Sequence, residues 1–369
     1  MEHGAALLHT IVTERRLWVI LTTPEIQLSR ESKVPRAELY KKITAFREAL
    51  EGRGDILPAA RELYDIIIAP IAKDLEQAKA RTLMFSLDGQ LRYIPIAALY
   101  DGEKWLAEKY AVVVYTEAAK DKLTKKTDIE MWELAGLGVT AGHPGFDPLP
   151  AVRGELEAIV REEGSAAGIP GVIYMDEKFV RSTLSEVLDD GTPVVHVASH
   201  FSFNPGTVAD SFLLLGDGDH LTLEDINTGA FTFKKVDQLT FSACNTAMGA
   251  GNREGAGREV EGLGVLAQKR GAKSVMATLW GVADNSTGIF MSRFYTLLLR
   301  PGMTKAEALR QTQVEFIEGK LNENNVPPAL RGSAVSSERD DARPSPSKAF
   351  PGYRHPFYWA PFILMGNWL

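Results

Sequence analysis

The segment QLTFSAC at residues 238–244 is an apolar, strand-like run that ends in Cys244, the only cysteine of the 369-residue chain. A glycine-rich stretch follows at residues 249–257, and a second apolar run upstream, VVHVASH at residues 194–200, ends in His200. A lone thiol at the end of one strand, with a histidine at the end of another, is the arrangement of a nucleophile and its base. The sequence therefore predicts a Cys244–His200 dyad.

Predicted strands and helices alternate around these two runs. Alternation of this kind implies a mainly parallel sheet that is covered by helices on both faces. In such sheets the chemistry lies at the carboxyl ends of the strands, which is where His200 and Cys244 are expected. The expected strands are residues 134–139, 194–200, 212–215, 238–244 and 273–279, and the expected helices are 152–162, 179–188, 259–269, 287–299 and 305–318.

The first third of the chain predicts a smaller unit of the same class. Its expected elements are a hairpin of strands 5–13 and 17–23, helices 36–50 and 59–79, a strand at 82–87 and extended segments at 91–95 and 111–115. We expect an N-terminal unit at 1–117, a polar linker at 118–131 and a C-terminal unit at 132–369. Within the last unit, residues 322–353 are rich in Ser, Pro and Arg, which predicts a mobile loop.

Composition narrows the class of protein. The net charge of -7 and the pI near 5.6 argue against a nucleic-acid binder. Basic residues gather at 120–126, but Asp121 interrupts them, so a solvated linker is expected there. A single cysteine excludes intrachain disulfides and favours a reducing compartment. No apolar stretch reaches the roughly 18 residues needed to span a bilayer, so we expect a soluble, cytoplasmic protein.

The two candidate catalytic residues also have ordinary interpretations. A free cysteine such as Cys244 is commonly a small buried hydrophobe, and His200 could simply satisfy a buried hydrogen bond. His196 lies four residues before His200 on the same face of its strand, which is compatible with a metal pair. Asp210 and Asp217 are not at ligand spacing, however, so His196 is interpreted as a core or supporting histidine. No metal or cofactor is expected.

Two further features have two interpretations each. The glycines of residues 249–257 could suggest a phosphate loop, but the Gly-Lys-Ser/Thr ending is missing, so mobility beside the thiol is the preferred interpretation. Asp284 follows the strand-like run of residues 273–279 and precedes an expected helix. It could cap that helix, or it could place a carboxylate at the base of a pocket for a basic side chain.

These segments resemble the CHAT domain, a family of caspase- and separase-like cysteine peptidases. The resemblance covers nearly the whole chain and keeps the order of the motifs. The matching segments are ELY at 62–64, LRYIPIAAL at 91–99, VHVASH at 195–200, SACNTA at 242–247, ATLWGVAD at 277–284, FY at 294–295, KAEAL at 305–309 and HPFYWAPFILMG at 355–366.

The resemblance implies a caspase-like α/β fold with an N-terminal pseudo-catalytic half and a C-terminal catalytic half. It assigns Cys244 as the nucleophile and His200 as the catalytic histidine, with the backbone N–H groups of Cys244 and Phe201 as oxyanion donors. It also implies that Asp284 lines the S1 pocket, with Asp210 as a weaker candidate. Cleavage of protein substrates after Arg or Lys is therefore expected.

One residue departs from the family pattern, since Phe201 stands where a glycine usually follows the catalytic histidine. Its bulk is expected to narrow the cleft or alter the loop. The rival prediction is a catalytically silent scaffold that serves protein interactions, and an acyltransferase or amidase would share the dyad.

Regulation and self-processing are also predicted. CHAT domains often follow helical repeats that sense a partner; none is visible, so a separate partner or sensor module is expected. Arg331, Arg339 and Arg343 are candidate self-cleavage sites in the predicted mobile loop.

Overall fold

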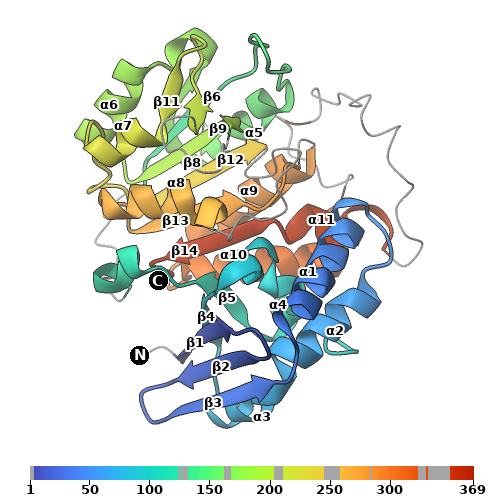
Figure 1. Cartoon of the computed structure of the whole chain (residues 1–369). Coiled ribbons are helices and arrows are strands. Elements are labelled where there is room, and N and C mark those ends of the chain that lie inside the picture. The colour runs from blue at the N-terminus through green and yellow to red at the C-terminus, as the bar shows by residue number, and fades with distance from the viewer. Residues whose placement is uncertain are drawn as a thin grey trace.

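The computed structural model describes residues 4–123, 125, 132–161, 168–202, 211–244, 258–282, 285–322, 330 and 350–369 (Figure 1). At residues 243–244 and 258–261 the description is of the backbone alone. Within these segments, no helix has the length and apolar character needed to cross a bilayer.

One large mixed sheet organises the described part of the chain. Twelve of its 14 strands follow the order β3-β2-β1-β4-β5-β14-β13-β12-β9-β6-β8-β7; β10 pairs with β9, and β11 pairs with β10. Neighbours run antiparallel at β1–β2–β3, at β13–β14 and at β9–β10–β11, and parallel elsewhere. The predicted α/β fold with a mainly parallel sheet flanked by helices is confirmed.

The first third of the chain builds one edge of this sheet. The expected hairpin and the helix that follows it are confirmed. The elements are β1 Ala5–Val12, β2 Leu17–Thr22, β3 Gln27–Ser32, α1 Arg36–Glu51, α2 Leu57–Ile67, η1 Ala69–Ile71, α3 Ala72–Gln77, β4 Thr82–Ser86, η2 Gly89–Tyr93, η3 Ile96–Ala98, α4 Leu106–Lys109, β5 Ala111–Val114 and η4 Glu117–Lys122.

Three expectations for this part were wrong. The single helix at 59–79 is interrupted near Pro70, which has no N–H to continue a helical ladder. Residues 91–95 lie largely in the short 3-10 helix η2 rather than in extended backbone. The edge strand β3 was missed because its sequence, QLSRES, is polar and none of its residues is buried, so it lacks the apolar alternation of a half-buried strand.

The rest of the chain alternates strands and helices much as expected. The antiparallel β10 is a departure, since it folds back on β9 rather than continuing the parallel sheet. The elements are β6 Leu134–Gly138, α5 Ala151–Ile159, β7 Val160–Arg161, β8 Ile169–Met175, η5 Asp176–Lys178, α6 Arg181–Asp190, β9 Val194–Ser202, β10 Phe212–Leu214, β11 His220–Thr222, α7 Leu223–Thr228, β12 Gln238–Cys244, α8 Arg258–Lys269, β13 Ser274–Thr278, α9 Asn285–Leu298, α10 Lys305–Ile317, η8 Gly352–Arg354, α11 Pro356–Trp359 and β14 Phe362–Gly366.

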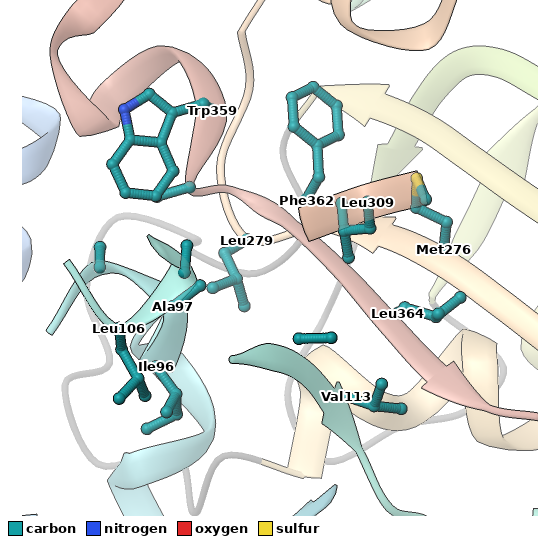
Figure 2. Packing of buried hydrophobic residues seen from close by; sticks show 14 of the residues in the cluster. Ile96, Ala97, Leu106, Val113, Met276, Leu279, Leu309, Trp359, Phe362 and Leu364 are labelled. Atoms are coloured by element: carbon teal, nitrogen blue, oxygen red, sulfur yellow. The ribbon is translucent and has the colours of Figure 1, made fainter. Parts of the chain in front are cut away.

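The C-terminal strand β14 joins the two parts of the sheet. It pairs antiparallel with β13 on one side and parallel with β5 on the other, where Met365 lies opposite Val114. Figure 2 shows the apolar core around this seam, where Trp359 and Phe362 from the end of the chain lie among side chains from both parts. The residues labelled there are Ile96, Ala97, Leu106, Val113, Met276, Leu279, Leu309, Trp359, Phe362 and Leu364.

In the second part of the sheet the two faces bury different cores. Helices α5 and α9 cover one face, while α6, α7 and α8 cover the other (Figure 1). The side chains of β9 alternate between these two faces. Val194 and Ala198 belong to the core under α5 and α9. Val195, Val197 and Phe201 belong to the opposite core. This alternation decides which side chains can meet at the site described below.

Only the margins and one interior residue of segment 322–353 fall within the described residues. Leu330 is buried, and a β-carbon added at Gly288 of α9 would come within 2.7 Å of its side chain. The candidate self-cleavage residues Arg331, Arg339 and Arg343 lie outside the described residues.

Candidate active site

The backbone brings the two predicted catalytic residues together. Strands β9 and β12 are parallel neighbours, and their register places Cys244 opposite His200. Both residues lie toward the carboxyl ends of their strands. Neighbouring strands in a sheet are about 4.8 Å apart, so the two Cα atoms are near neighbours. For Cys244 the structure describes the backbone but not the side chain.

A loop after β6 holds the His200 ring. The side-chain Nε2 of His200 lies 2.7 Å from the carbonyl oxygen of Asp147, and the ring packs against Phe146 with centroids 5.1 Å apart. A carbonyl oxygen can only accept, so Nε2 carries the hydrogen of this bond. In a neutral imidazole the lone pair is then on Nδ1, which is free to accept a proton.

Phe146 is also the centre of a small aromatic cluster. Its ring lies 6.0 Å from that of Phe212 and 6.5 Å from that of His220, and these two rings stack on each other at 3.5 Å. The cluster braces the loop against β10 and β11, which keeps the Asp147 carbonyl near His200.

Asp176 anchors the start of the same loop. Its carboxylate accepts hydrogen bonds from the backbone N–H of Thr140 at 2.6 Å, from the Thr140 hydroxyl at 2.7 Å and from the N–H of Ala141 at 3.1 Å. Burial alone would raise the pKa of Asp176, but these bonds outweigh it and the pKa is lowered.

The backbone at Asp176 is itself unusual. It adopts a φ of 49°, and a β-carbon at the neighbouring Gly216 would come within 1.7 Å of the Asp176 carbonyl oxygen. A glycine is therefore required at position 216 for this close approach. The strained conformation and the three accepted bonds indicate that the loop is held firmly at its base.

Phe201 does not crowd the site in the expected way. Its side chain is 3% exposed and belongs to the core beneath α6–α8, which is the face opposite that of His196 and Ala198. Its backbone continues strand β9, where Phe201 is the register partner of Leu213 in β10. The expectation that its bulk would narrow the cleft is not supported by this placement.

A buried polar chain runs beneath the site. Nε2 of His196 lies 3.0 Å from Oε1 of Glu155, and its Nδ1 lies 3.1 Å from the hydroxyl of Tyr295. That hydroxyl is 2.8 Å from Oγ1 of Thr240, the residue opposite His196 in β12. His196 is completely buried, as expected for a supporting core histidine.

The directions of these bonds form one consistent pattern. The amide of Gln238 donates to the Thr240 hydroxyl at 3.3 Å, which can donate to Tyr295. Tyr295 can then donate to Nδ1 of His196, and Nε2–H of His196 to Glu155. Burial raises the pKa of Tyr295, so its hydroxyl stays protonated and available as a donor.

The position of Glu155 depends on glycine in the sheet. A β-carbon at Gly138 of β6 would lie 2.7 Å from side-chain atoms of Val152 and Leu156, both on α5. Without that β-carbon the helix approaches the sheet closely enough for Glu155 to reach His196. Sequence reasoning missed Glu155 and Tyr295 as partners, although Glu155 was visible as a charged residue within an otherwise amphipathic helix.

Several predicted site residues are not placed. Asp210, Asp284 and the glycine-rich residues 249–257 lie outside the described residues. Across the described ranges, no group of three or more His, Cys, Asp or Glu side chains is arranged to hold a metal ion.

Comparisons with known proteins identify the fold. Two crystal structures of the Saccharomyces cerevisiae separase–securin complex match with TM-scores of 0.55 and 0.56, each at 9% identity. Each match covers 99% of this chain and 30% of the separase chain, so the chain spans under a third of that protein. The Arg-specific cysteine proteinase gingipain R matches with a TM-score of 0.46, at 9% identity, over 90% of this chain and 74% of that one.

Sequence comparison gives the family. No curated protein sequence matches the chain. The profile of the CHAT domain matches residues 57–367, which is most of the chain. The chain belongs to the CHAT domain family.

Proposed function

We propose that this protein is a cysteine endopeptidase in which Cys244 is the nucleophile and His200 the general base. The observation that carries the proposal is the register of β9 and β12, in which Cys244 is the direct neighbour of His200. The bond from Nε2 of His200 to the Asp147 carbonyl adds support, because it leaves Nδ1 as the proton acceptor.

The proposed reaction proceeds in two steps. Nδ1 of His200 accepts the thiol proton of Cys244, and the thiolate attacks the scissile carbonyl carbon. The proton then passes to the leaving amine as the C–N bond breaks, which leaves an acyl-enzyme. A water molecule gives a proton to Nδ1 of His200 and attacks the acyl carbon. The C–S bond then breaks, the acid is released, and His200 returns the proton to the sulfur of Cys244.

The oxyanion donors in this proposal are backbone N–H groups. The N–H of Cys244 lies at the end of its strand and is the stronger candidate. That of Phe201 lies within β9, where Phe201 is the register partner of Leu213 in β10.

The proposed specificity is for Arg or Lys at P1. Asp284 is the proposed S1 carboxylate and Asp210 the second candidate, since a carboxylate pairs with a cationic side chain. Substitution of Asp284 by Asn should reduce cleavage after Arg far more than it reduces thiol reactivity.

A panel of fluorogenic peptides with Arg, Lys, Asp, Leu and Ala at P1 tests the function. Cleavage after Arg or Lys that disappears in Cys244→Ala is the expected result. Cleavage that persists in Cys244→Ala would refute the assignment of the nucleophile. If no peptide is cleaved and Cys244 also fails to react rapidly with iodoacetamide near neutral pH, the silent scaffold replaces the peptidase as the better proposal.

We also propose that a partner protein regulates the activity. The matched separase was crystallised in complex with securin, and this chain corresponds to under a third of that separase. A separate protein or a sensor module is the proposed source of the signal. The reducing compartment inferred from the single cysteine suggests a cytoplasmic setting.

A further inference from the structure

The basic residues near position 122 share a cavity with cations from other parts of the chain. Lys122 and Lys125 line an open cavity of about 560 Å³ together with Lys234, Lys269, Arg270 and Lys273. These six cations come from three separate segments of a chain whose net charge is -7. No carboxylate is among the described residues that line the cavity.

The cavity is distinct from the candidate active site. It lies where α8 ends and β13 begins, and its lining residue Lys273 pairs with Asp237, which directly precedes β12. Cys244 is at the other end of β12, roughly 20 Å away for seven residues of strand. A ligand in this cavity would therefore not occupy the substrate position.

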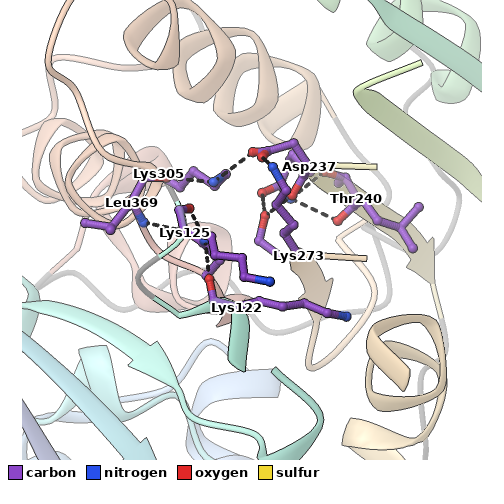
Figure 3. A network of polar contacts seen from close by, with 11 residues as sticks. Lys122, Lys125, Asp237, Thr240, Lys273, Lys305 and Leu369 are labelled. Carbon is purple, nitrogen blue, oxygen red and sulfur yellow. Dashed lines mark hydrogen bonds and ion pairs between the residues drawn. The ribbon is translucent and has the colours of Figure 1, made fainter. Parts of the chain in front are cut away.

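Several contacts hold the cations in place around the cavity. The buried amide of Asn367 donates to the carbonyl oxygens of Lys122 at 2.6 Å and of Lys125 at 2.7 Å. The ammonium of Lys122 donates to the carbonyls of Gln268 at 2.6 Å and Ala272 at 3.3 Å. Figure 3 shows Lys122 and Lys125 within this polar network, which also contains Lys273. The backbone of Lys122 and Lys125 and the ammonium of Lys122 are thus held in place before any ligand arrives.

Carboxylates neutralise little of this charge. Asp237 pairs with Lys273 at 3.0 Å, but it also pairs with Lys305 at 2.8 Å, so one carboxylate serves two cations (Figure 3). Within the described residues, Lys125, Lys234, Lys269 and Arg270 have no carboxylate within the 4.0 Å of an ion pair.

The pKa of Lys122 also reflects its surroundings, which include a second cation. Its pKa is lowered by burial and then by the nearby Lys125, while Asp121 opposes the effect only weakly. The end of α8 explains part of the basic clustering, since cations are favoured at a helix C-terminus. A helix end carries about half an elementary charge, however, which is far less than six cations.

We propose that this basic cavity binds a compact polyanion that carries several linked phosphate groups, such as a polyphosphate or a nucleoside polyphosphate. Three or more phosphates place four to five negative charges within a few ångströms, which matches cations that converge on one cavity. Its volume lies within the range of small-molecule sites. An acidic peptide spreads its charges along about 3.3 Å per residue and on alternating sides, so fewer of them reach the cavity.

Isothermal titration calorimetry with tripolyphosphate tests this assignment. The buffer contains a metal chelator and little salt. We expect saturable binding that weakens as salt is raised, and a second titration with ATP separates a need for phosphates alone from a contribution of the nucleoside. The double variant Lys234→Gln/Lys269→Gln should bind at least tenfold more weakly. Both side chains are exposed, so the fold should be retained, and thermal unfolding checks this.

The matched control is Lys41→Gln/Lys73→Gln, which makes the same change in charge at exposed positions on α1 and α3. The control should bind as the wild type does. The proposal is overturned if tripolyphosphate does not bind at millimolar concentration, or if the control loses as much affinity as the cavity variant. Tighter binding of a glutamate-rich peptide than of tripolyphosphate would overturn the phosphate assignment. None of these readouts requires peptidase activity.

Discussion

Nε2 of His200 lies 2.7 Å from the carbonyl oxygen of Asp147, so a loop after β6 fixes the orientation of a histidine on β9. The two residues are 53 positions apart in the chain. The hydrogen on Nε2 is determined by this contact, because a carbonyl cannot donate.

Replacement of His200 by Ala should lower kcat/KM about 10²- to 10⁴-fold, which is the usual contribution of a general base. The side chain is only partly buried, so the thermal unfolding midpoint should change little. Peptide cleavage and the rate of thiol alkylation across pH 5–9 measure the effect. His9→Ala, in the N-terminal part of the sheet, is the control and should leave both unchanged. A variant that loses activity only because it unfolds would not support the assignment.

Asp176→Asn should weaken the loop that carries Asp147. The carboxylate accepts three hydrogen bonds, and loss of its charge should lower the free energy of unfolding by about 1.5–3 kcal/mol. The kcat should fall more than KM rises, because His200 is held less firmly. Urea denaturation and steady-state kinetics measure both effects. Asp189→Asn, at an exposed position on α6, is the control. An unchanged pH profile of thiol alkylation would argue against a positioning role for Asp176.

Tyr295→Phe should destabilise the fold by about 1–3 kcal/mol, since it leaves Nδ1 of His196 and the hydroxyl of Thr240 without their shared partner. A double-mutant cycle with Thr240→Val, measured by urea denaturation, should give a coupling energy well above zero. The partly buried Tyr174 offers a control, because Tyr174→Phe removes a hydroxyl for which the described residues provide no hydrogen-bond partner. Additive effects in the cycle would show that the two hydroxyls act separately.

Phe201→Ala should destabilise the protein by about 3–5 kcal/mol, because a buried aromatic side chain is removed from the core beneath α6–α8. Activity per folded molecule should stay within a few-fold of the wild type. Denaturation curves and active-site titration separate the two quantities. A large gain in activity per folded molecule would instead mean that the Phe201 side chain obstructs the cleft.

The buried His355 should make stability depend on pH. Burial, with a smaller effect of Arg53, lowers the pKa of His355 below its ordinary value despite an opposing bond to Gly54. The unfolded chain therefore takes up a proton near pH 6.5 while the folded chain resists it. The contribution of His355 to the free energy of unfolding is therefore complete above about pH 6.5. It is lost as the pH falls through the pKa of the folded state.

The variant His355→Asn measures this contribution. Asn can still cap α11, where Nδ1 of His355 accepts the N–H of Phe357 at 3.1 Å, but it does not titrate. The loss of stability between pH 7 and pH 5 in urea denaturation should be smaller than in the wild type. His9→Asn should keep the wild-type slope. Equal slopes for His355→Asn and wild type would assign the acid sensitivity to other groups.

The sequence was sufficient for those elements whose stability depends on local pattern. Residues 238–244 form β12 as expected, and Thr304 caps α10 by accepting the N–H of Glu307 at 3.1 Å. These features follow from side-chain periodicity and from capping chemistry, both of which act over a few residues. The prediction that His200 and Cys244 lie at the carboxyl ends of strands required only the strand positions and the class of the sheet, whereas the pairing of β9 with β12 is given by the structure.

Other features depend on contacts between distant segments. A local pattern could not predict that β14 would enter between β5 and β13, nor that β10 would turn back on β9. Likewise, only the structure shows that the lysines near position 122 share a cavity with Lys234 and Lys269, which are more than 100 residues further along the chain.

The sequence by itself determined that Cys244 and His200 lie at strand ends, that strands and helices alternate, and which family the chain resembles. Each of these features depends on residues that are contiguous in the chain. Only the tertiary structure decided which face buries Phe201, which carbonyl orients His200, and which cations share a cavity. The physical reason is that packing and electrostatic interactions depend on distance in space, and the order of residues along the chain does not give that distance.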